Sequence, residues 1–536
     1  MKTKHFNILL SIVSLLVIVV VSLRSILIPI NHDEAATFFY YIQTGVFLPF
    51  LSHVDVNNHF LNSALSYFSF SLFGDAPFSL RLPNLFALLV LIFASYRFSL
   101  MLKSSAAKLA LVAGLLLSIH WLSFYSVTRG YGLSMGFMLL SLVYLVEYFQ
   151  DLKIRKFLFF LISIHIAISA ILIILIPAIV ATGFILLFQL KDGKIKSPKL
   201  LALHLGNALL LFFWVKWSFF FKDAGALYHG EGNNYFEVTF RTLIEMLSGY
   251  QHDVVIYAIA ATGILVLLSP ILLFRKSLKS LLVVFKEPAL FFLTLFLSLL
   301  LCFYLMKKLL GINYPEDRTG LFFYLIFILI LAFAIDAIKA NWKNIAGWLI
   351  FGVFVVHFAT QLNFTHYNLT TMPHRFYDRL LAEQNESEER ITIGGHFSSE
   401  LFFAFMNYRN NTVLNLPHPP PDFQFNTDYY IAHDFQKKMY DEYYEEIDVD
   451  EPTGYNLLKR RVKPERKAMF SMAGEQRFTG DAEFYELFSF SDTTFADEAV
   501  IMGEFNFSVH QADAPHLVWL VYSIDTDSGS YYRRFP

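Results

Sequence analysis

Charged residues and cysteines are scarce in this chain of 536 residues. Only 16% of the residues are charged, whereas ordinary soluble domains have about 25%. The single cysteine, Cys302, lies inside an apolar run, which excludes a disulfide framework and a cysteine-based metal site. The formal net charge of −2 provides no basic surface for nucleic acid, so we expect no nucleic-acid partner.

Long apolar runs are abundant instead. Hydrophobic residues make up 56% of the chain and aromatic residues 17%, with 59 phenylalanines. Several runs reach the length of about 20 residues that a helix needs to cross a hydrocarbon core. The expected fold class is therefore a polytopic α-helical membrane protein. The first run, 7–30, has no small-residue cleavage site after it, and we interpret it as a retained span.

The apolar runs predict eleven transmembrane helices. They cover 7–30, 82–102, 107–126, 130–149, 156–171, 173–190, 200–219, 254–274, 288–306, 319–338 and 344–361. The fifth and sixth spans share one apolar stretch, and counting it as a single span would reverse the topology of everything that follows.

Lysine and arginine are unevenly divided between the loops. They gather in the loops on the N-terminal side, while the opposite loops hold most of the carboxylates. The positive-inside rule therefore places the N-terminus in the cytoplasm, and an odd number of spans places the C-terminal region outside. The lack of disulfides and the Phe-, Ile- and Lys-rich composition favour a bacterial inner membrane.

A change of composition after about residue 361 predicts three regions. Residues 1–361 form the transmembrane domain, with a long outer loop at 31–81. Residues 379–463 predict a small extracytoplasmic α/β domain, and residues 464–536 a β-rich, sandwich-like segment. Within the α/β domain we expect strands at 391–394, 412–414 and 428–432 and a helix near 398–407. The β-rich segment has strand-like stretches at 484–488, 499–507 and 516–524, and it ends where another strand begins, so we expect an incomplete sandwich or a truncated chain.

Two outer loops are long. The stretch 59–73 in the first loop is too short and too polar to span easily, which predicts a re-entrant or surface helix along the membrane interface. The loop 220–253 contains Gly225, Gly230 and Gly232 and an Asn-Asn pair, which indicates a mobile segment.

Asp33 and Glu34 lie just after the first span, at its water edge. Adjacent residues on a helix point about 100° apart, so the two carboxylates cannot face one spot and would have different roles. One interpretation is helix capping, because carboxylates favour helix N-termini and an apolar run begins at Ala35. The other is the chemical centre of a membrane enzyme, and the motifs that follow favour it.

An ordered set of short motifs accompanies the acidic pair. The set comprises Asn57-Asn58-His59-Phe60-Leu61-Asn62, Phe73-Gly74-Asp75, Arg81-Leu82-Pro83 and Arg129-Gly130-Tyr131. In motif order and topology, residues 1–361 resemble the GT-C superfamily of membrane glycosyltransferases, in the branch that holds the protein O-mannosyltransferases and the lipid A aminoarabinose transferase. That family often has His-Pro-Pro-Leu where this chain has Asn58-His59-Phe60-Leu61.

The resemblance implies transfer of a monosaccharide from a polyprenyl-phosphate carrier to a lipid, glycan or protein acceptor at the outer face of the membrane. It implies Asp33 as the general base of a single inverting displacement, with Glu34 orienting the acceptor or Asp33 itself. A carboxylate at the membrane edge can take the proton of an acceptor hydroxyl. We expect no cofactor and no metal, including at His53, Asp55 and His59.

Cations at the outer face are candidate ligands of the departing phosphate, on which negative charge builds. The expected donor-binding residues are His59, Arg81, Arg129, Tyr131 and Arg318. Each arginine also has a structural interpretation. Arg129 could snorkel to the interface, Arg318 could pair with Asp317, and Arg81 could open a helix ahead of Pro83.

Three isolated histidines, His120, His165 and His204, lie in or near spans without a carboxylate at helical spacing. We interpret them as hydrogen-bonded packing residues.

The alternative function is a transporter or flippase of lipid-linked sugars. Such a protein would have ionisable residues paired in mid-membrane and two related halves, and the sequence shows neither. A membrane-anchored carbohydrate-binding module would leave the ten further spans unexplained.

Overall fold

The computed structural model describes residues 3–191, 197–227, 230, 232–275, 281–367, 370–417, 427–463, 520–526 and 529–535. The chain divides into two compact units. The first comprises Met1–His374 and Ala404–Thr412, and the second comprises Arg375–Phe403 and Val413–Pro536.

The first unit is a bundle of helices. Among the described residues, nine helices are long and apolar enough to cross a membrane. They are α1 Thr3–Leu27, α4 Pro77–Met101, α7 Tyr131–Asp151, the η2–α9 segment Leu172–Lys191, α10 Pro198–Asp223, α12 Asp253–Phe274, α14 Pro288–Leu310, the η4–α15 segment Asp317–Ala337 and α16 Lys343–Gln361. The shorter helices are α2 His32–Thr37, η1 Phe38–Ile42, α3 Phe60–Phe73, α5 Ser105–Leu116, α6 Ile119–Ser123, α8 Ile154–Ala170, η3 Phe236–Arg241, α11 Thr242–Ser248 and α13 Leu281–Lys286.

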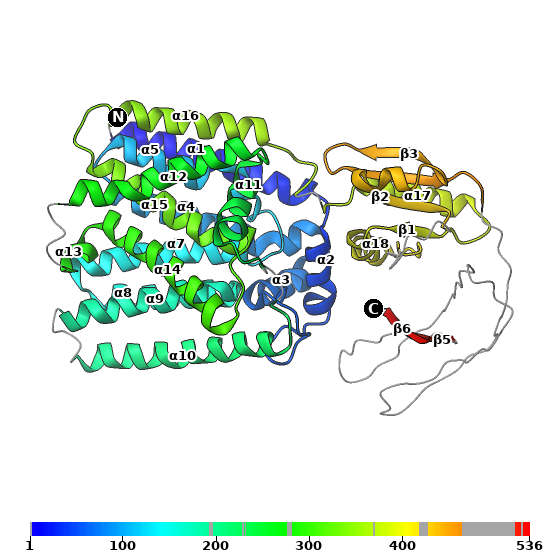
Figure 1. Ribbon diagram of the computed structural model, residues 1–536, viewed down its shortest axis with the longest axis horizontal. Coiled ribbons are helices and arrows are strands. Elements are labelled where there is room, and N and C mark those ends of the chain that lie inside the picture. Colours follow the sequence, from blue (N-terminus) through cyan, green and yellow to red (C-terminus); the bar gives the residue numbers. More distant parts are fainter. Residues whose placement is uncertain are drawn as a thin grey trace. The chain divides into compact units, whose positions relative to one another are not determined.

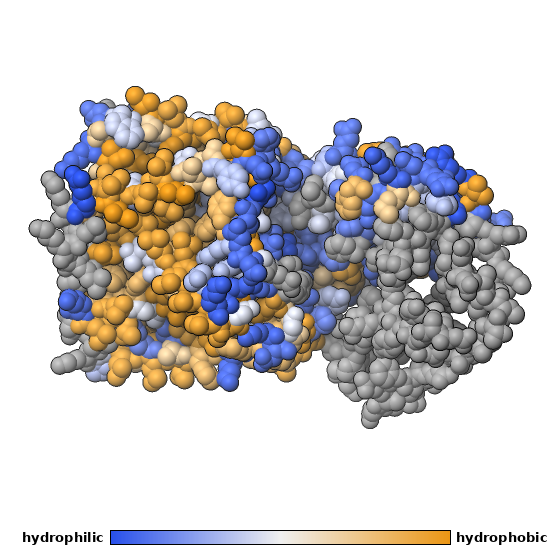
Figure 2. All heavy atoms as spheres, viewed as in Figure 1, coloured by the Kyte–Doolittle hydropathy of each residue, from blue (hydrophilic) through white to orange (hydrophobic). Residues whose placement is uncertain are grey.

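Hydrophobic side chains cover much of the visible face of this bundle (Figure 2). Leu209 on α10, Leu265 on α12 and Val356 on α16 are each more than 60% exposed. A soluble protein rarely exposes so continuous an apolar surface, whereas lipid tails solvate it without cost. The predicted fold class is confirmed: the chain is an integral, polytopic helical membrane protein with a small C-terminal sheet region.

The two remaining predicted spans form shorter helices. The run 107–126 breaks into α5 and α6, because Leu117 leaves the helical conformation (φ −127°, ψ 8°). The run 156–171 forms α8, which has 17 residues. The number of eleven spans therefore stays a prediction. The division of 156–190 into two helices is confirmed, since Ile171 is extended between α8 and α9.

The second predicted span begins earlier than expected. Helix α4 starts at Pro77, so Arg81 and Pro83 lie inside the helix rather than at its start. Pro83 has no N–H to donate to the carbonyl of Ser79, one turn before it. The hydroxyl of Ser69 on α3 donates to that carbonyl instead, at 2.5 Å. The interior proline thus ties α4 to α3.

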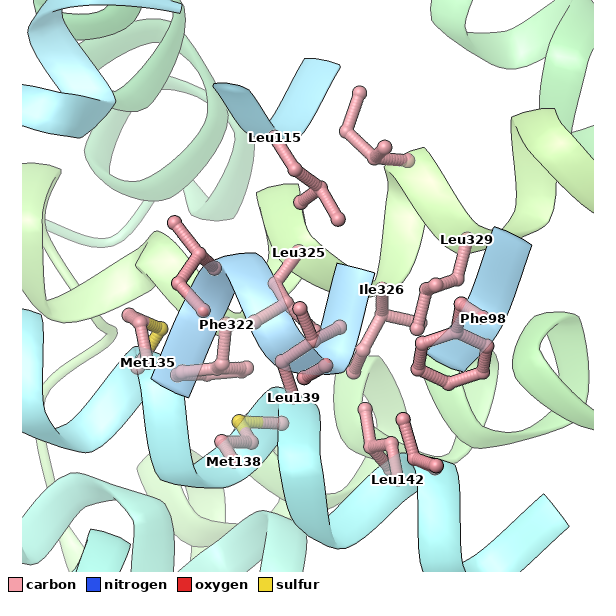
Figure 3. Close-up of a cluster of buried hydrophobic side chains, with 14 of the residues drawn as sticks. Phe98, Leu115, Met135, Met138, Leu139, Leu142, Phe322, Leu325, Ile326 and Leu329 are labelled. Atoms are coloured by element: carbon pink, nitrogen blue, oxygen red, sulfur yellow. The ribbon is translucent and has the colours of Figure 1, made fainter. Parts of the chain in front are cut away.

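The core of the bundle lies between α4, α5, α7 and α15. Figure 3 shows this cluster of buried side chains: Phe98, Leu115, Met135, Met138, Leu139, Leu142, Phe322, Leu325, Ile326 and Leu329. Helix α15 is apolar around its whole circumference, which is typical of a helix enclosed by others.

Helices α2, α3 and α11 lie at one end of the bundle, and the N-terminus and α13 lie at the other (Figure 1). The stretch 59–73 forms a helix as predicted, α3. The loop 220–253 contains two helical segments, η3 and α11, which the sequence did not predict. The elements of the two loops that are predicted to lie outside and the acidic pair therefore share one end of the unit.

The second unit contains a four-stranded sheet in the order β1-β2-β4-β3. Its elements are α17 His374–Glu386 from Arg375 onward, β1 Ile393–Gly395, the part of α18 Phe397–Asn410 up to Phe403, β2 Tyr429–His433, η5 Asp434–Met439, β3 Tyr444–Asp450 and β4 Tyr455–Arg460. Strands β1 and β2 are parallel and the other pairs are antiparallel. Two of the predicted strands and the predicted helix are present, but 412–417 has no regular structure, so the strand expected at 412–414 is wrong.

A separate antiparallel hairpin, β5 Leu520–Thr526 with β6 Gly529–Phe535, falls within the predicted β-rich segment. It matches the strand expected at 516–524 and the one expected to begin near the end of the chain. The strands expected at 484–488 and 499–507 lie outside the described residues.

Candidate active site

Glu34 lies at the centre of a buried polar cluster. Asn31 and Glu34 form a capping box at the start of α2: the Asn31 side chain accepts from the Glu34 N–H at 3.1 Å, and the Glu34 carboxylate accepts from the Asn31 N–H at 3.2 Å. Arg81 donates to the two carboxylate oxygens of Glu34 at 2.9 and 2.7 Å. Both side chains are fully buried, at 0% exposure, so each charge depends on the other.

Arg81 also joins α4 to the end of α1. Its guanidinium donates to the carbonyls of Ser25, Ile28 and Pro29 at 3.1, 2.8 and 3.1 Å. The last carbonyls of a helix have no partner within the helix, and Arg81 supplies one. The structural interpretation of Arg81 agrees with these contacts, although the helix begins one turn before it.

Glu34 holds the chain corner that leads into α7 as well. The N–H of Thr128 donates to Glu34 at 2.5 Å. Asn84 completes the support, because it donates to the carbonyl of Val127 at 2.9 Å and accepts from the N–H of Leu133 at 3.1 Å. Glu34 thus fixes its neighbour Asp33 through α2 and fixes Arg129 through Thr128.

Asp33 makes a different set of contacts, as the angle between neighbouring helical residues predicts. Its side chain is 24% exposed. Both Arg129 and Arg318 contact the same oxygen, Oδ2, from their Nη2 atoms at 3.5 and 3.2 Å. One carboxylate therefore lies between two guanidinium groups.

Arg129 is only 3% exposed, so it is a buried cation rather than a snorkelling one. Its Nη2 also donates to the Oδ1 atom of Asn57 at 2.9 Å. Its Nε and Nη1 atoms are buried and have no hydrogen-bond partner among the described residues. Unpaired buried donors are costly, and an anion with two oxygens could satisfy both.

Arg318 is positioned by the loop that the sequence indicated as mobile. The backbone N–H of Gly230 donates to Glu316 at 2.9 Å, and that of Asp317 donates to the Thr242 hydroxyl at 2.9 Å. The expected neighbour Asp317 accepts from the backbone N–H of Arg318. The Arg318 guanidinium itself reaches Asp33.

Tyr131 and His59 complete the group. The guanidinium carbons of Arg129 and Arg318 each lie 5.9 Å from the centroid of the Tyr131 ring, at a distance typical of cation–π contacts. The His59 ring lies 5.3 Å from the same ring. Four of the five expected donor-binding residues therefore gather around Asp33, whereas Arg81 belongs to the buried cluster around Glu34.

The electrostatics of the site follow from this arrangement. Burial raises the pKa of Asp33, but Arg129 and Arg318 together outweigh it and hold that pKa well below its usual range. Burial and the same two guanidinium groups also hold the pKa of His59 well below its usual range. At neutral pH Asp33 is charged and His59 is neutral, so two positive groups face one negative group.

The glycines beside Arg129 have a packing role. A Cβ atom on Gly130 would lie 2.1 Å from the Ala170 carbonyl oxygen and 3.0 Å from the Cβ of His59. A Cβ on Gly132 would lie 2.7 Å from Oδ1 of Asn84. Neighbouring protein atoms therefore approach the backbone closely at both glycines.

We expect Gly130→Ala to lower the free energy of unfolding by about 1–3 kcal/mol, because backbone must move to make room. Thermal unfolding in lipid or detergent measures this. Gly183→Ala in α9 is the matched control, since a Cβ there meets nothing within 4 Å, and helix propensity favours alanine by about 1 kcal/mol. Equal effects of the two changes would contradict the packing role.

Sequence reasoning missed two contributors. Asn57 holds Arg129 from the turn before α3. Tyr367 follows the last span and lies close enough to Arg318, Tyr131 and Arg129 for their charges to influence it, while burial raises its pKa. Arg24 fixes the segment of Tyr367 by donating to the carbonyls of Asn363 and His366. Nothing local in the sequence marks Tyr367 as a site residue.

No group of three or more metal-ligating side chains occurs in the part of the chain that the structure describes. His53 stacks on Tyr40, with ring centroids 4.6 Å apart, and Asp55 accepts from the N–H of Asn57. Two of the three isolated histidines, His165 and His204, are hydrogen-bonded packing residues, as predicted, whereas the buried Nε2 atom of His120 has no hydrogen-bond partner in the described part of the chain. His165 contacts Asn207 at 2.9 Å, His204 contacts Gln189 at 2.7 Å, and the His120 ring packs against His357.

No protein-family model matches this chain, and no curated protein sequence matches it. Two solved structures are similar in fold. The structure of ArnT from Cupriavidus metallidurans in the apo state has a TM-score of 0.46 and 12% identity, over 85% of this chain and 98% of that chain. The structure of the same protein bound to undecaprenyl phosphate has a TM-score of 0.46 and 11% identity over the same shares. At this degree of similarity we base no functional conclusion on either structure.

Proposed function

We propose that this protein is a GT-C-type glycosyltransferase that moves a monosaccharide from a polyprenyl-phosphate carrier to an acceptor hydroxyl at the outer face of the membrane. The observation that supports this most is the Asp33 carboxylate between Arg129 and Arg318. Transfer from a lipid phosphate needs one group that accepts a proton and others that stabilise the leaving phosphate. Both kinds of group meet here at the end of a membrane bundle.

In the proposed reaction, Asp33 takes the proton of the acceptor hydroxyl. The acceptor oxygen forms a bond to the anomeric carbon of the sugar while the bond from that carbon to the phosphate oxygen breaks. The electron pair of the broken bond stays on the phosphate, which leaves with one more negative charge. A single displacement of this kind inverts the anomeric configuration.

The other residues of the site bind the donor or hold the reacting groups in position. Arg129 and Arg318 neutralise the negative charge of the phosphate. Arg129 has two buried N–H donors available for the phosphate oxygens. The ring of Tyr131 stabilises both guanidinium groups through cation–π contacts. Neutral His59 presents an unpaired Nε2 atom as a hydrogen-bonding group. Glu34 and Arg81 touch no substrate and act as positioning residues.

The proposed setting follows the loop charges. The N-terminus lies in the cytoplasm, and the site and the C-terminal unit lie outside, in a bacterial inner membrane. The isoprenoid tail of the donor lies among the membrane spans. The acceptor is a lipid, glycan or protein, and no cofactor takes part. This arrangement puts Asp33 at the level of lipid headgroups, where a carrier phosphate lies.

A flippase would use ionisable residues in mid-membrane. In the described residues, the ion pairs of α4 and α7 lie near the helix ends: Arg81 contacts Glu34 at the site end, and Glu147 contacts both Arg97 and Lys156 at the other end. The polar contacts deep in the spans are between neutral partners, such as His165 with Asn207. This distribution favours the glycosyltransferase.

The test is a transfer assay with the full-length protein in lipid nanodiscs. A panel of radiolabelled polyprenyl-phosphate sugars is offered together with a crude cell-envelope acceptor fraction. We expect label to pass to the acceptor fraction from at least one donor. Asp75→Asn, another outer-face carboxylate, is the matched control and should transfer as the wild type does. No transfer from any donor, together with translocation of the labelled lipid across vesicles, would replace the proposal with a flippase.

A further inference from the structure

Asp33 and the proposed donor phosphate compete for the same two arginines. The Oδ2 atom of Asp33 contacts Arg129 and Arg318, and the proposed donor phosphate would contact the same two guanidinium groups. No other carboxylate is ion-paired with either arginine in the described residues. Glu34, the adjacent acid, forms its buried ion pair with Arg81 instead.

The surroundings of Asp33 are mostly cationic or neutral. The groups whose charges act on it are Arg129 from the corner before α7, Arg318 from η4, His32 from α2 and His59 from the start of α3. Behind the arginines lie Tyr131, Asp317 and Tyr367. Both guanidinium groups contact the Asp33 carboxylate directly, while Asp317 also acts on Arg318. A phosphodiester that replaced Asp33 as their ligand would exchange one single negative charge for another.

A carboxylate held by two guanidinium groups is a weak proton acceptor, as the lowered pKa of Asp33 shows. A general base needs a proton affinity close to that required at the working pH. The pairing that holds Asp33 in place therefore also opposes its proposed chemistry. Something must weaken the two ion pairs before the acceptor loses its proton.

We infer that the donor phosphate itself activates Asp33, by taking Arg129 and Arg318 as its own ligands and leaving the carboxylate free to accept a proton. This inference rests on the proposed function. It makes deprotonation of the acceptor dependent on a bound donor. Since linkage is reciprocal, neutralising Asp33 must strengthen the binding of the phosphate by the same factor.

The charge balance of the reaction fits this coupling. Before transfer, Asp33 and the phosphodiester each carry one negative charge. During transfer the acceptor proton neutralises Asp33, and the leaving phosphate gains the electron pair of the broken bond and becomes a dianion. One negative charge thus moves from Asp33 to the phosphate. The two guanidinium groups that pair with Asp33 before the donor binds then neutralise the charge on the phosphate.

The test measures binding without turnover, in full-length protein in nanodiscs of zwitterionic lipid. The probe is the methyl phosphodiester of polyprenyl phosphate, which carries one negative charge and has no second ionisation. At neutral pH, Asp33→Asn should bind it about 10-fold more tightly than the wild type, a typical size for coupling between sites.

Matched variants separate the possible results. Asp75→Asn should bind as the wild type does, and Arg318→Gln should weaken binding both with and without Asp33→Asn. Inorganic phosphate should displace the probe, whereas phosphatidylglycerol added to the nanodiscs should leave its affinity unchanged; the opposite result for either would overturn the contact with the carrier phosphate. The unfolding temperature of each variant shows whether it is folded.

Two failures are distinguishable. If the wild type transfers sugar but Asp33→Asn binds the probe no more tightly, the activation by phosphate is overturned and the glycosyltransferase remains. If the wild type neither binds the probe nor transfers sugar, the proposed function is overturned together with the inference.

Discussion

Asp33→Asn should reduce sugar transfer by about 10²–10⁴-fold, the usual contribution of a positioned general base. The change is nearly isosteric, and an amide cannot take a proton from the acceptor at neutral pH. The loss should appear in kcat and not as weaker donor binding. Arg129 and Arg318 keep their other supports, which include Asn57 for Arg129 and the backbone of Glu316–Thr319 for Arg318, and they no longer pair with a charged Asp33.

The measurement is the rate of label transfer at saturating donor, with Asp75→Asn as the control for removing an outer-face charge. An unfolding temperature close to that of the wild type would show that Asp33→Asn is folded. If Asp33→Asn transferred sugar at the wild-type rate, the assignment of Asp33 as the base would be wrong, although the protein could still be a glycosyltransferase.

Glu34→Gln should lower the free energy of unfolding by about 3–5 kcal/mol, the usual cost of removing one partner from a buried ion pair. The substitution keeps the shape of the side chain but leaves the charge of Arg81 buried without a counter-charge. It also weakens the contact to the Thr128 N–H, so we expect the corner that carries Arg129 to loosen.

The matched control is Glu389→Gln, which removes the carboxylate of an equally short ion pair. Glu389 and Lys463 are 2.7 Å apart, as Arg81 and Glu34 are, but both side chains are 64% exposed. We expect a change within about 0.5 kcal/mol there, because water already solvates both charges. Chemical or thermal unfolding in detergent compares the two. Similar losses in both variants would refute a special role for the buried pair.

The transmembrane architecture could be predicted largely from the sequence. Hydropathy is a local property, since each span must by itself offer an apolar surface to lipid and satisfy its own backbone. For this reason the predicted runs match α1, α7, α10, α12, α14 and α16 within a few residues. The run 107–126 became two shorter helices because the chain leaves the helix at Leu117, whereas the run 156–171 matches α8, which ends before Ile171.

The local chemistry of the acidic pair was also predictable. Two neighbours on a helix point in different directions, so different environments for Asp33 and Glu34 followed from geometry alone. The capping interpretation is confirmed for Glu34, which is a member of a capping box, whereas Asp33 is the partly exposed acid on which the proposed chemistry rests. Sequence order could not decide which acid took which place.

The partners of these residues were decided by tertiary structure. The sequence marked Arg81, Arg129 and Arg318 as cations at one face, but only packing assigned Arg81 to Glu34 and the other two to Asp33. Likewise Gly130 is required by the carbonyl of Ala170, and Tyr367 is brought to the site by Arg24. The sequence by itself determined the spans and the kinds of charge at the membrane edge. Which charges meet depends on contacts between distant segments, because such contacts leave no periodic or local signal in the chain.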